Sequence, residues 1–236
     1  MIRHFTPEDN QNNDNEYHKQ LRAQAQESIG TPDDKEFTEQ EIKNAVASME
    51  HNKAPGEDGI TSEIFKSVVK ILPGYITAIH NGCLRSGTFP TRWKKGKILP
   101  VTKLGKESSE VSKFRPISLL NIGGKVLEKV LINTINHHVF LQGFMNKNQY
   151  GFTPQKGTID AAMEIKEIVK EGLAAGDVTA LVSLDVKGAF DAAWWPGILK
   201  ELRACGCPKN LYELKRTILP SAQRLCQLTA FDWREE

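Results

Sequence analysis

Two carboxylates near residue 190 have the residue types and the spacing that metal chemistry requires. Asp185 closes a nearly continuous apolar, β-branched run over residues 178–186, and Asp191 follows it after a Gly-Ala turn. Such a run is typical of a strand buried on both faces, where a carboxylate is costly unless a cation or hydrogen-bond donors compensate it. Mg²⁺ is one such cation, since it binds carboxylates and substrate phosphates. The alternative is that Asp185 only caps the following turn, and residues 184–191 alone leave both interpretations open.

A basic stretch in the middle of the chain has the composition of a phosphate-binding surface. Between residues 85 and 106 the sequence has seven basic residues and no acidic one, namely Arg85, Arg92, Lys94, Lys95, Lys97, Lys103 and Lys106. Clustered Lys and Arg side chains displace counterions from a polyanion. A solvated surface without a ligand is the alternative, so the surrounding sequence has to decide between the two.

The spacing of other reactive residues does not support further sites. Gly105-Lys106-Glu107 lacks both the glycine spacing and the Ser or Thr of a P-loop. Lys187 stands where a haloacid-dehalogenase-type phosphotransferase has its second Asp. Cys205 and Cys207 have no second cysteine pair, which argues against zinc and favours reduced thiols near the core.

Composition places the chain among ordinary globular proteins. It has 236 residues, of which 39% are hydrophobic and 25% charged, and a formal net charge of +2. These values exclude collagen-like and wholly disordered chains. The sequence has no run of about 18 apolar residues, the length that a bilayer-spanning helix needs. Residues 1–16 lack the apolar core of a secretory signal. We therefore expect an intracellular protein.

Hydrophobic periodicity indicates an α+β fold in which helices dominate the first part of the chain. Residues 1–36 are expected to be a mobile polar leader with a short helix near residues 17–27. The capping-box pattern of Thr38 and Glu41 predicts the start of a helix, and residues 54–59 predict a turn. Further helices are predicted over residues 64–72, 75–84, 124–141, 158–173 and 196–202, and extended segments over 97–101, 114–120 and 178–186.

Four segments, in this order, resemble one family of enzymes. They are residues 52–60 (NKAPGEDGI), 114–121 (FRPISLLN), 149–161 (QYGF, KGT and DA) and 184–191 (LDVKGAFD). Together they resemble the fingers and first palm motifs of the reverse transcriptases of non-LTR (LINE-like, jockey-type) retrotransposons. The resemblance implies helix-rich fingers plus an incomplete palm of a right-hand polymerase. Its implied division is a leader (1–36), a partial reverse transcriptase domain (37–228) and a divergent tail (229–236).

The resemblance also implies roles for individual residues. Asp185 would be a catalytic metal ligand, and Val186 would offer its backbone carbonyl to the same Mg²⁺ ions. Phe190 would pack beneath the incoming sugar, while Arg115 and Lys103 would hold the triphosphate unless they are only surface cations. The expected contacts to nucleic acid are Lys94, Lys95, Lys97 and Gln149, although Gln149 would alternatively brace the fingers.

The partners implied for the full-length parent are an RNA template, a DNA primer and a deoxynucleoside triphosphate, with a nuclear location. The family also has an aromatic-x-Asp-Asp motif that supplies further metal ligands, and no Asp-Asp pair follows Asp185. We therefore expect a chain truncated before the second palm motif, inactive alone, with unpaired edges along residues 178–186. The alternatives are a non-catalytic nucleic-acid-binding remnant and a helical scaffold without a nucleic-acid role.

Overall fold

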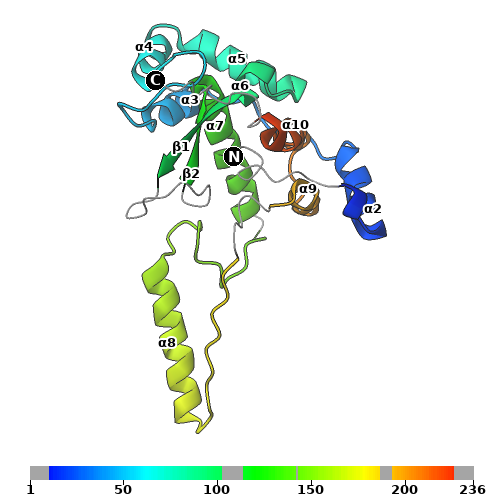
Figure 1. Ribbon diagram of the computed structural model, residues 1–236, viewed down its shortest axis with the longest axis vertical. Helices are drawn as coiled ribbons and strands as arrows, with labels where there is room; N and C mark the ends of the chain where they lie inside the picture. Colours follow the sequence, from blue (N-terminus) through cyan, green and yellow to red (C-terminus); the bar gives the residue numbers. More distant parts are fainter. Residues whose placement is uncertain (1–10, 103–113, 142, 187–192, 226–236) are drawn as a thin grey trace, which may run out of the picture.

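The computed structural model describes residues 11–102, 114–141, 143–186 and 193–225. The first elements are η1 (Gln11–Asn13), α2 (Glu16–Gln26), α3 (Glu39–Ala47), α4 (Ser62–Ile71), α5 (Pro73–Ser86) and α6 (Thr91–Lys94). They are followed by β1 (Gly96–Thr102), β2 (Phe114–Leu120), α7 (Ile122–Leu141), α8 (Thr158–Ala174), α9 (Trp195–Ala204) and α10 (Lys209–Leu225) (Figure 1). None of the described helices is long and apolar enough to cross a membrane.

Local sequence signals account for the ends of several helices. The Thr38 hydroxyl accepts the Glu41 N–H at 3.2 Å, and the Glu41 carboxylate accepts the Thr38 N–H at 2.7 Å, which confirms the predicted capping box. Helix α5 begins at Pro73 and ends before Gly87, whose φ of +58° is left-handed. The predicted helices over residues 64–72, 75–84, 124–141, 158–173 and 196–202 correspond to α4, α5, α7, α8 and α9.

The two predicted extended segments at residues 97–101 and 114–120 form an antiparallel pair. The register runs from Gly96 opposite Leu120 to Thr102 opposite Phe114. Within the part of the chain that the structure describes, this is a sheet of two strands, so each strand has a free edge. Pro100 and Pro116 face each other in the register, which is compatible with a sheet edge because neither has an N–H to donate.

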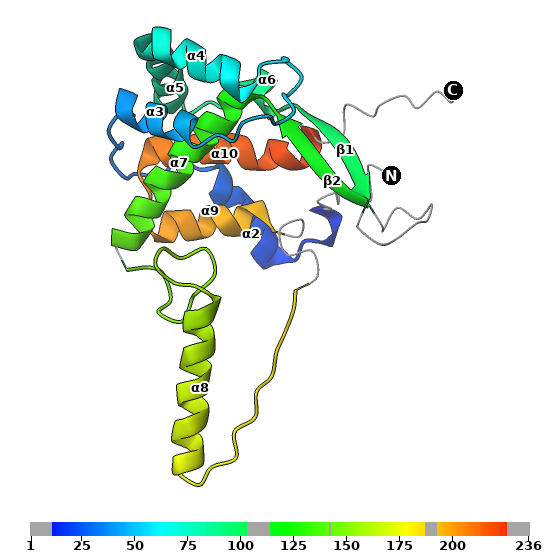
Figure 2. The same ribbon diagram turned by 90° about the vertical axis from the view of Figure 1, so that its left-hand side faces the viewer.

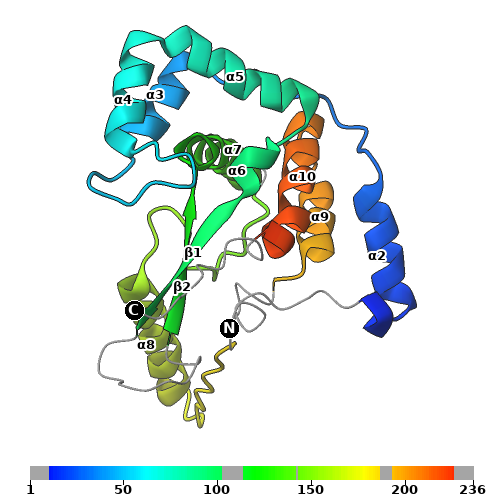
Figure 3. The same cartoon turned by 45° about the horizontal axis from the view of Figure 1, so that its top comes forward.

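Helix α7 lies in the middle of the packed body. Figures 2 and 3 show α3, α4 and α5 on one side of it and α9 and α10 on the other. The apolar stripe predicted for this helix is buried, with Val126, Leu127 and Leu131 fully inaccessible to solvent. From the opposite side, Leu199 of α9 and Leu211 of α10 are equally buried. One hydrophobic core therefore joins the first and last described helices.

The N-terminal segment differs from the expected mobile leader. The short helix predicted near residues 17–27 is present as α2, and its Leu21 and Ala25 are buried. The Arg22 guanidinium lies 5.4 Å from the Trp194 ring centre, next to the start of α9. These contacts place residues 16–36 in the packed body, because two buried apolar side chains and a cation–π contact anchor α2.

Residues 178–186 do not form the strand predicted from their apolar pattern. The segment is extended but unpaired, and Val178 and Leu184 are 99% and 88% exposed. Together with α8, which has no buried residue, it projects from the body (Figures 1 and 2). A buried strand needs neighbouring strands to pair its backbone and cover its faces, and the described residues supply none to this segment.

Candidate nucleic-acid interface

The loop at residues 52–60 and the end of β2 meet at Asn121, which is only 4% exposed. The Asn121 side-chain amide donates to the Arg92 carbonyl oxygen at 3.1 Å, and its Oδ1 accepts the Asp58 N–H at 3.4 Å. A Cβ on Gly56 would lie 2.3 Å from that oxygen and 2.6 Å from the Asn121 backbone nitrogen, so glycine is required. The structure thus brings together two segments that lie far apart in the sequence.

The same loop is held in shape by local hydrogen bonds. The Asp58 carboxylate accepts the Ile60 N–H at 3.1 Å, and Gly59 between them has a φ of +71°. At the other end of the loop, Asn52 donates its N–H to the Glu63 carboxylate at 2.8 Å. This hydrogen bond is the largest influence that lowers the Glu63 pKa to about 2.

A small cleft of about 190 Å³ lies between this loop and the start of α7. Lys53 from the loop and Lys125 from the first turns of α7 line it. Lys53 also forms an exposed ion pair with Glu50 at 2.9 Å. Glu50 also lines the cleft, so its two lysines, beside the N-terminus of a long helix, leave it with a net positive lining that favours phosphates.

The hairpin positions only part of the predicted nucleotide site. Arg115 lies in β2 opposite Val101 of β1, while its side chain falls outside the described part of the structure. Lys103 and Phe190, the other residues predicted to hold the nucleotide, also lie outside the described residues. The structure therefore gives the backbone position of one of the three residues.

The basic stretch divides into structural and solvent-facing residues. Arg85 forms an ion pair with Glu36. The Lys94 ammonium donates to the Thr217 carbonyl oxygen at 2.7 Å, and partial burial lowers the Lys94 pKa. Lys95 is exposed and Lys97 is half-buried at the start of β1. Lys95 is consequently better placed than Lys94 to contact a polyanion.

Gln149 lies in the loop between α7 and α8. It is exposed, and its side-chain amide donates to the Gly151 carbonyl oxygen at 2.8 Å. In the same loop the Lys156 ammonium lies 4.9 Å from the Tyr150 ring centre. The observed contacts of Gln149 stabilise its own loop, which leaves its exposed surface available to a ligand.

Asp185 and Val186 lie on the exposed segment 178–186 rather than at the end of a buried strand. Val186 is 69% exposed. Among the described residues, no group of three or more His, Cys, Asp or Glu side chains is arranged to bind a metal ion. The described acidic residues therefore do not by themselves assemble a Mg²⁺ site around Asp185, and Asp191 lies outside the described part of the chain.

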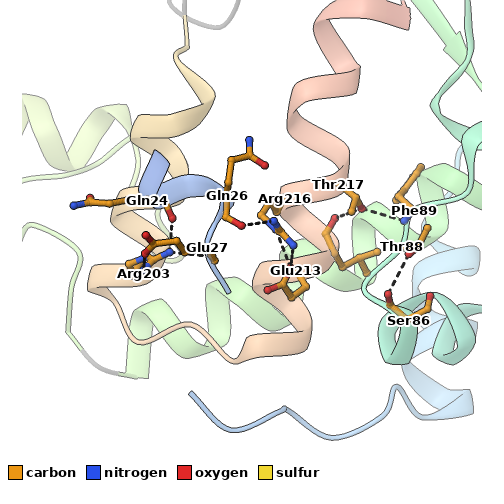
Figure 4. Close-up of polar contacts among 11 residues, drawn as sticks. Gln24, Gln26, Glu27, Ser86, Thr88, Phe89, Arg203, Glu213, Arg216 and Thr217 are labelled. Atoms are coloured by element: carbon orange, nitrogen blue, oxygen red, sulfur yellow. Dashed lines mark hydrogen bonds and ion pairs between the residues drawn. The ribbon is translucent and has the colours of Figure 1, made fainter. Parts of the chain in front are cut away.

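Helix α10 braces the segment that leads into the hairpin (Figure 4). The Thr217 hydroxyl accepts the Phe89 N–H at 3.1 Å, and the Thr217 carbonyl accepts Lys94. On the other side of α10, Arg216 donates to the Gln26 carbonyl oxygen at 2.7 Å, at the end of α2. Helix α10 thus connects the N-terminal helix to the base of the hairpin.

The sequence analysis assigned no role to three residues that position this interface, namely Gly56, Asn121 and Thr217. Gly56 and Asn121 lie in the quoted motifs, and the available signals were a glycine in a turn and an asparagine directly before a helix. Neither signal identifies the partner. Thr217 was missed because no helix was predicted after residue 206, and Pro220 inside the α10 range weakens the helical pattern there.

Comparison with known proteins places this chain in a family. The family model described as reverse transcriptase (RNA-dependent DNA polymerase) matches residues 101–234. The chain is 30% identical over 182 residues to the RNA-directed DNA polymerase from mobile element jockey of Drosophila melanogaster, covering 77% of this chain and 20% of that protein. Identity to the Drosophila funebris jockey polymerase is 32% over 181 residues, covering 75% and 19%. A Bradysia coprophila Pol polyprotein of retrotransposable element R1 is 29% identical over 165 residues, covering 69% and 16%. The chain thus spans at most about a fifth of these relatives.

Proposed function

The chain belongs to the reverse transcriptase family, in its jockey-type non-LTR branch, and from this we propose that it is part of an RNA-directed DNA polymerase of a retrotransposon. The reaction proposed for the whole protein is RNA-templated addition of deoxynucleotides to the 3′ end of a DNA primer. The proposal is supported by the family match over residues 101–234 and by relatives that carry this activity in their names.

The junction at Asn121 is the observation that carries the proposal to this chain. It connects the 52–60 loop, the end of the hairpin and the start of α7 through buried contacts. Lys53, Lys95 and Lys125 lie on these elements, two of them exposed and one half-buried. We assign these lysines to the phosphate backbone of a nucleic acid, since ammonium groups on rigid elements bind phosphate without reading its sequence.

Catalysis in this family implies a divalent metal, for which we propose Mg²⁺ with Asp185 as one ligand. Two-metal phosphoryl transfer needs several carboxylates at one place, and the described acidic residues do not converge. We therefore expect this chain alone to bind a primer–template without extending it. For Val186, Lys103, Arg115 and Phe190 we propose the roles that the family resemblance implies.

Two measurements on the purified chain test this function. Fluorescence anisotropy with a labelled RNA–DNA primer–template should show binding that weakens steeply as salt increases. Primer extension with the same duplex, Mg²⁺ and dNTPs should show no incorporation. Absence of salt-dependent binding would contradict the nucleic-acid assignment, whereas incorporation would contradict only the expected inactivity.

A non-catalytic nucleic-acid-binding protein is the second candidate, favoured by the exposed Asp185, which belongs to no metal-binding group among the described residues. Asp185→Asn separates the two functions in a chain extended with an aromatic-x-Asp-Asp segment. The polymerase assignment predicts that extension is lost while binding remains intact. The binding-protein assignment predicts no extension before or after the substitution.

A further inference from the structure

A groove between α3 and α4 combines an apolar floor with cationic walls. Its volume is about 530 Å³, and it is lined by Lys43, Val46, Ala47, Lys66, Val69 and Lys70. Lys43 pairs with Glu39 at 3.1 Å, and the Lys66 ammonium donates to the Met49 carbonyl oxygen at 2.7 Å. Lys70 is exposed and has no ion pair with another described residue. The methylene stems of the lysines extend the apolar lining while their charges stay near solvent.

The chemistry of this groove favours an acidic amphipathic helix as its occupant. The lining has no aromatic ring or guanidinium on which a nucleobase could stack. An apolar floor between lysines instead suits a helix whose aliphatic side chains enter the groove and whose carboxylates meet the ammonium groups.

The same chain carries a helix of this kind. In α8, Glu164, Glu167 and Glu171 follow one another at helical spacing, so they share one face, on which Glu167 also forms an exposed ion pair with Lys170 at 2.7 Å. Ile165 and Ile168 lie beside that face and are 41% and 55% exposed. No residue of α8 is buried. The helix thus presents an acidic and an apolar surface that the rest of the described chain leaves uncovered.

The position of α8 directs it toward another molecule. Figures 1 and 2 show α8 at one end of the long axis of the chain and α3 and α4 at the opposite end. A helix at one end of a molecule meets a groove at the other end only by joining a second copy. An interface between two different surfaces of identical chains is heterologous and repeats from copy to copy.

We propose that copies of this chain associate head to tail, with α8 of one copy seated in the α3–α4 groove of the next. Ile165 and Ile168 then cover the floor formed by Val46 and Ala47. The acidic face of α8 lies against the lysines of the groove, with Lys70 as the cation that gains a partner.

Charge reversal on either side of the interface tests the proposal in sedimentation-velocity experiments with the nuclease-treated full chain. The unmodified chain should sediment faster as its concentration rises. The groove variant combines Lys43→Glu with Lys70→Glu, and the helix variant combines Glu164→Lys with Glu167→Lys. Each variant should associate only at concentrations about tenfold higher or more than the unmodified chain. Lys129→Glu, a reversal at an exposed lysine outside the groove, should leave association unchanged.

Mixing the two variants distinguishes this arrangement from other contacts. The groove variant still has an intact α8 and the helix variant an intact groove, and the two reversed surfaces are opposite in charge. The mixture should therefore form dimers and longer assemblies at concentrations where neither variant associates alone. Circular dichroism verifies that both variants are folded. The proposal is overturned if the unmodified chain stays monomeric, if the groove variant associates normally, or if the mixture forms no dimers. An unaffected groove variant with a monomeric helix variant would assign the contact to α8 paired with itself.

Discussion

The side-chain oxygen of Asn121 occupies the space that any side chain at position 56 would need. A Cβ on Gly56 would lie 2.3 Å from Asn121 Oδ1, well inside van der Waals contact. Because Asn121 also holds the Arg92 carbonyl oxygen at 3.1 Å, the close approach fixes the 52–60 loop against α6 and the start of α7. The lysines that we assign to nucleic acid depend on this junction for their positions.

Gly56→Ala should destabilise the protein by about 1–3 kcal/mol, because the new methyl group has no space and the loop must move. Urea unfolding followed by circular dichroism gives the free energy of unfolding. Gly30→Ala is the matched control, since nothing lies within 4 Å of a Cβ at that position. Equal stabilities of the two variants would contradict the close approach.

Testing Gly56→Ala in a chain that also carries Asn121→Ala shows which atoms of the junction restrict position 56. A Cβ on Gly56 would also lie 2.6 Å from the Asn121 backbone nitrogen and 2.7 Å from the Leu120 carbonyl carbon, and neither atom is removed by the substitution. Gly56→Ala should therefore remain destabilising in the Asn121→Ala chain. Complete rescue in a double-mutant cycle would show that only the side-chain oxygen restricts position 56.

Lys94 and Lys95 should respond oppositely to substitution although they are neighbours. Lys94→Met removes the hydrogen bond to the Thr217 carbonyl oxygen, so stability should fall by about 1–2 kcal/mol while RNA affinity is unchanged. Lys95→Met removes an exposed charge. RNA affinity should then fall, with a salt slope smaller by about 0.7 for each lost phosphate contact. Anisotropy titrations at several salt concentrations measure both effects, and a reversed pattern would reject our division of the basic stretch.

The buried His80 should make stability depend on pH. The residue is 1% exposed, and this burial lowers its pKa below the ordinary value of about 6.5. The ring contacts to the Ile76 and Gly123 carbonyl oxygens raise the pKa, but their effect is smaller than that of burial. The unfolded chain therefore binds the proton more readily than the folded chain. Stability should be fully present above pH 6.5 and should fall as the pH decreases through 6.5 toward the folded pKa. The slope for one proton is at most about 1.4 kcal/mol per pH unit.

We would measure the free energy of unfolding at about pH 7.5 and at about pH 5.5, for the unmodified chain and for His80→Gln. The variant should show a weaker loss of stability on acidification. His137→Gln serves as a control at a less buried histidine. If the stability of the unmodified chain and of His80→Gln depends on pH in the same way, His80 is not the source of that pH dependence.

Arg203 and Arg216 should control the attachment of α2. Arg203 donates to the Gln24 and Glu27 carbonyl oxygens, and Arg216 donates to that of Gln26 (Figure 4). Replacing both arginines by Met should accelerate amide hydrogen exchange in α2 by about tenfold or more, because charged hydrogen bonds to the end of the helix are lost. Exchange in α7 should not change. Uniform acceleration across both helices would indicate global destabilisation instead.

Local patterns were sufficient wherever the determinant lies within a few residues. The capping box at Thr38 and the apolar stripe over residues 124–141 correctly predicted α3 and α7. The extended segments predicted at residues 97–101 and 114–120 correspond to the strands β1 and β2. Helix capping and periodic burial depend on neighbours in sequence, so a sequence pattern contains the information required.

Residues 178–186 show where such patterns are insufficient. Their composition predicted a buried strand, yet in this structure they are extended and exposed. A strand exists only through hydrogen bonds to another strand, and an apolar run does not specify which segment supplies them. Asp185 depends on that strand for its position, which is why a metal site predicted from sequence is not assembled among the described residues.

Sequence patterns alone predicted the main helices before residue 206, the two extended segments that pair as β1 and β2, and the family to which the motifs belong. Three contacts became known from the folded chain alone: Gly56 lies against Asn121, Lys94 donates to the Thr217 carbonyl oxygen of α10, and α2 packs on the body. Each of these contacts joins segments that are distant along the chain. Their geometry arises from the packing of whole helices around a common core, which no local spacing of residue types records.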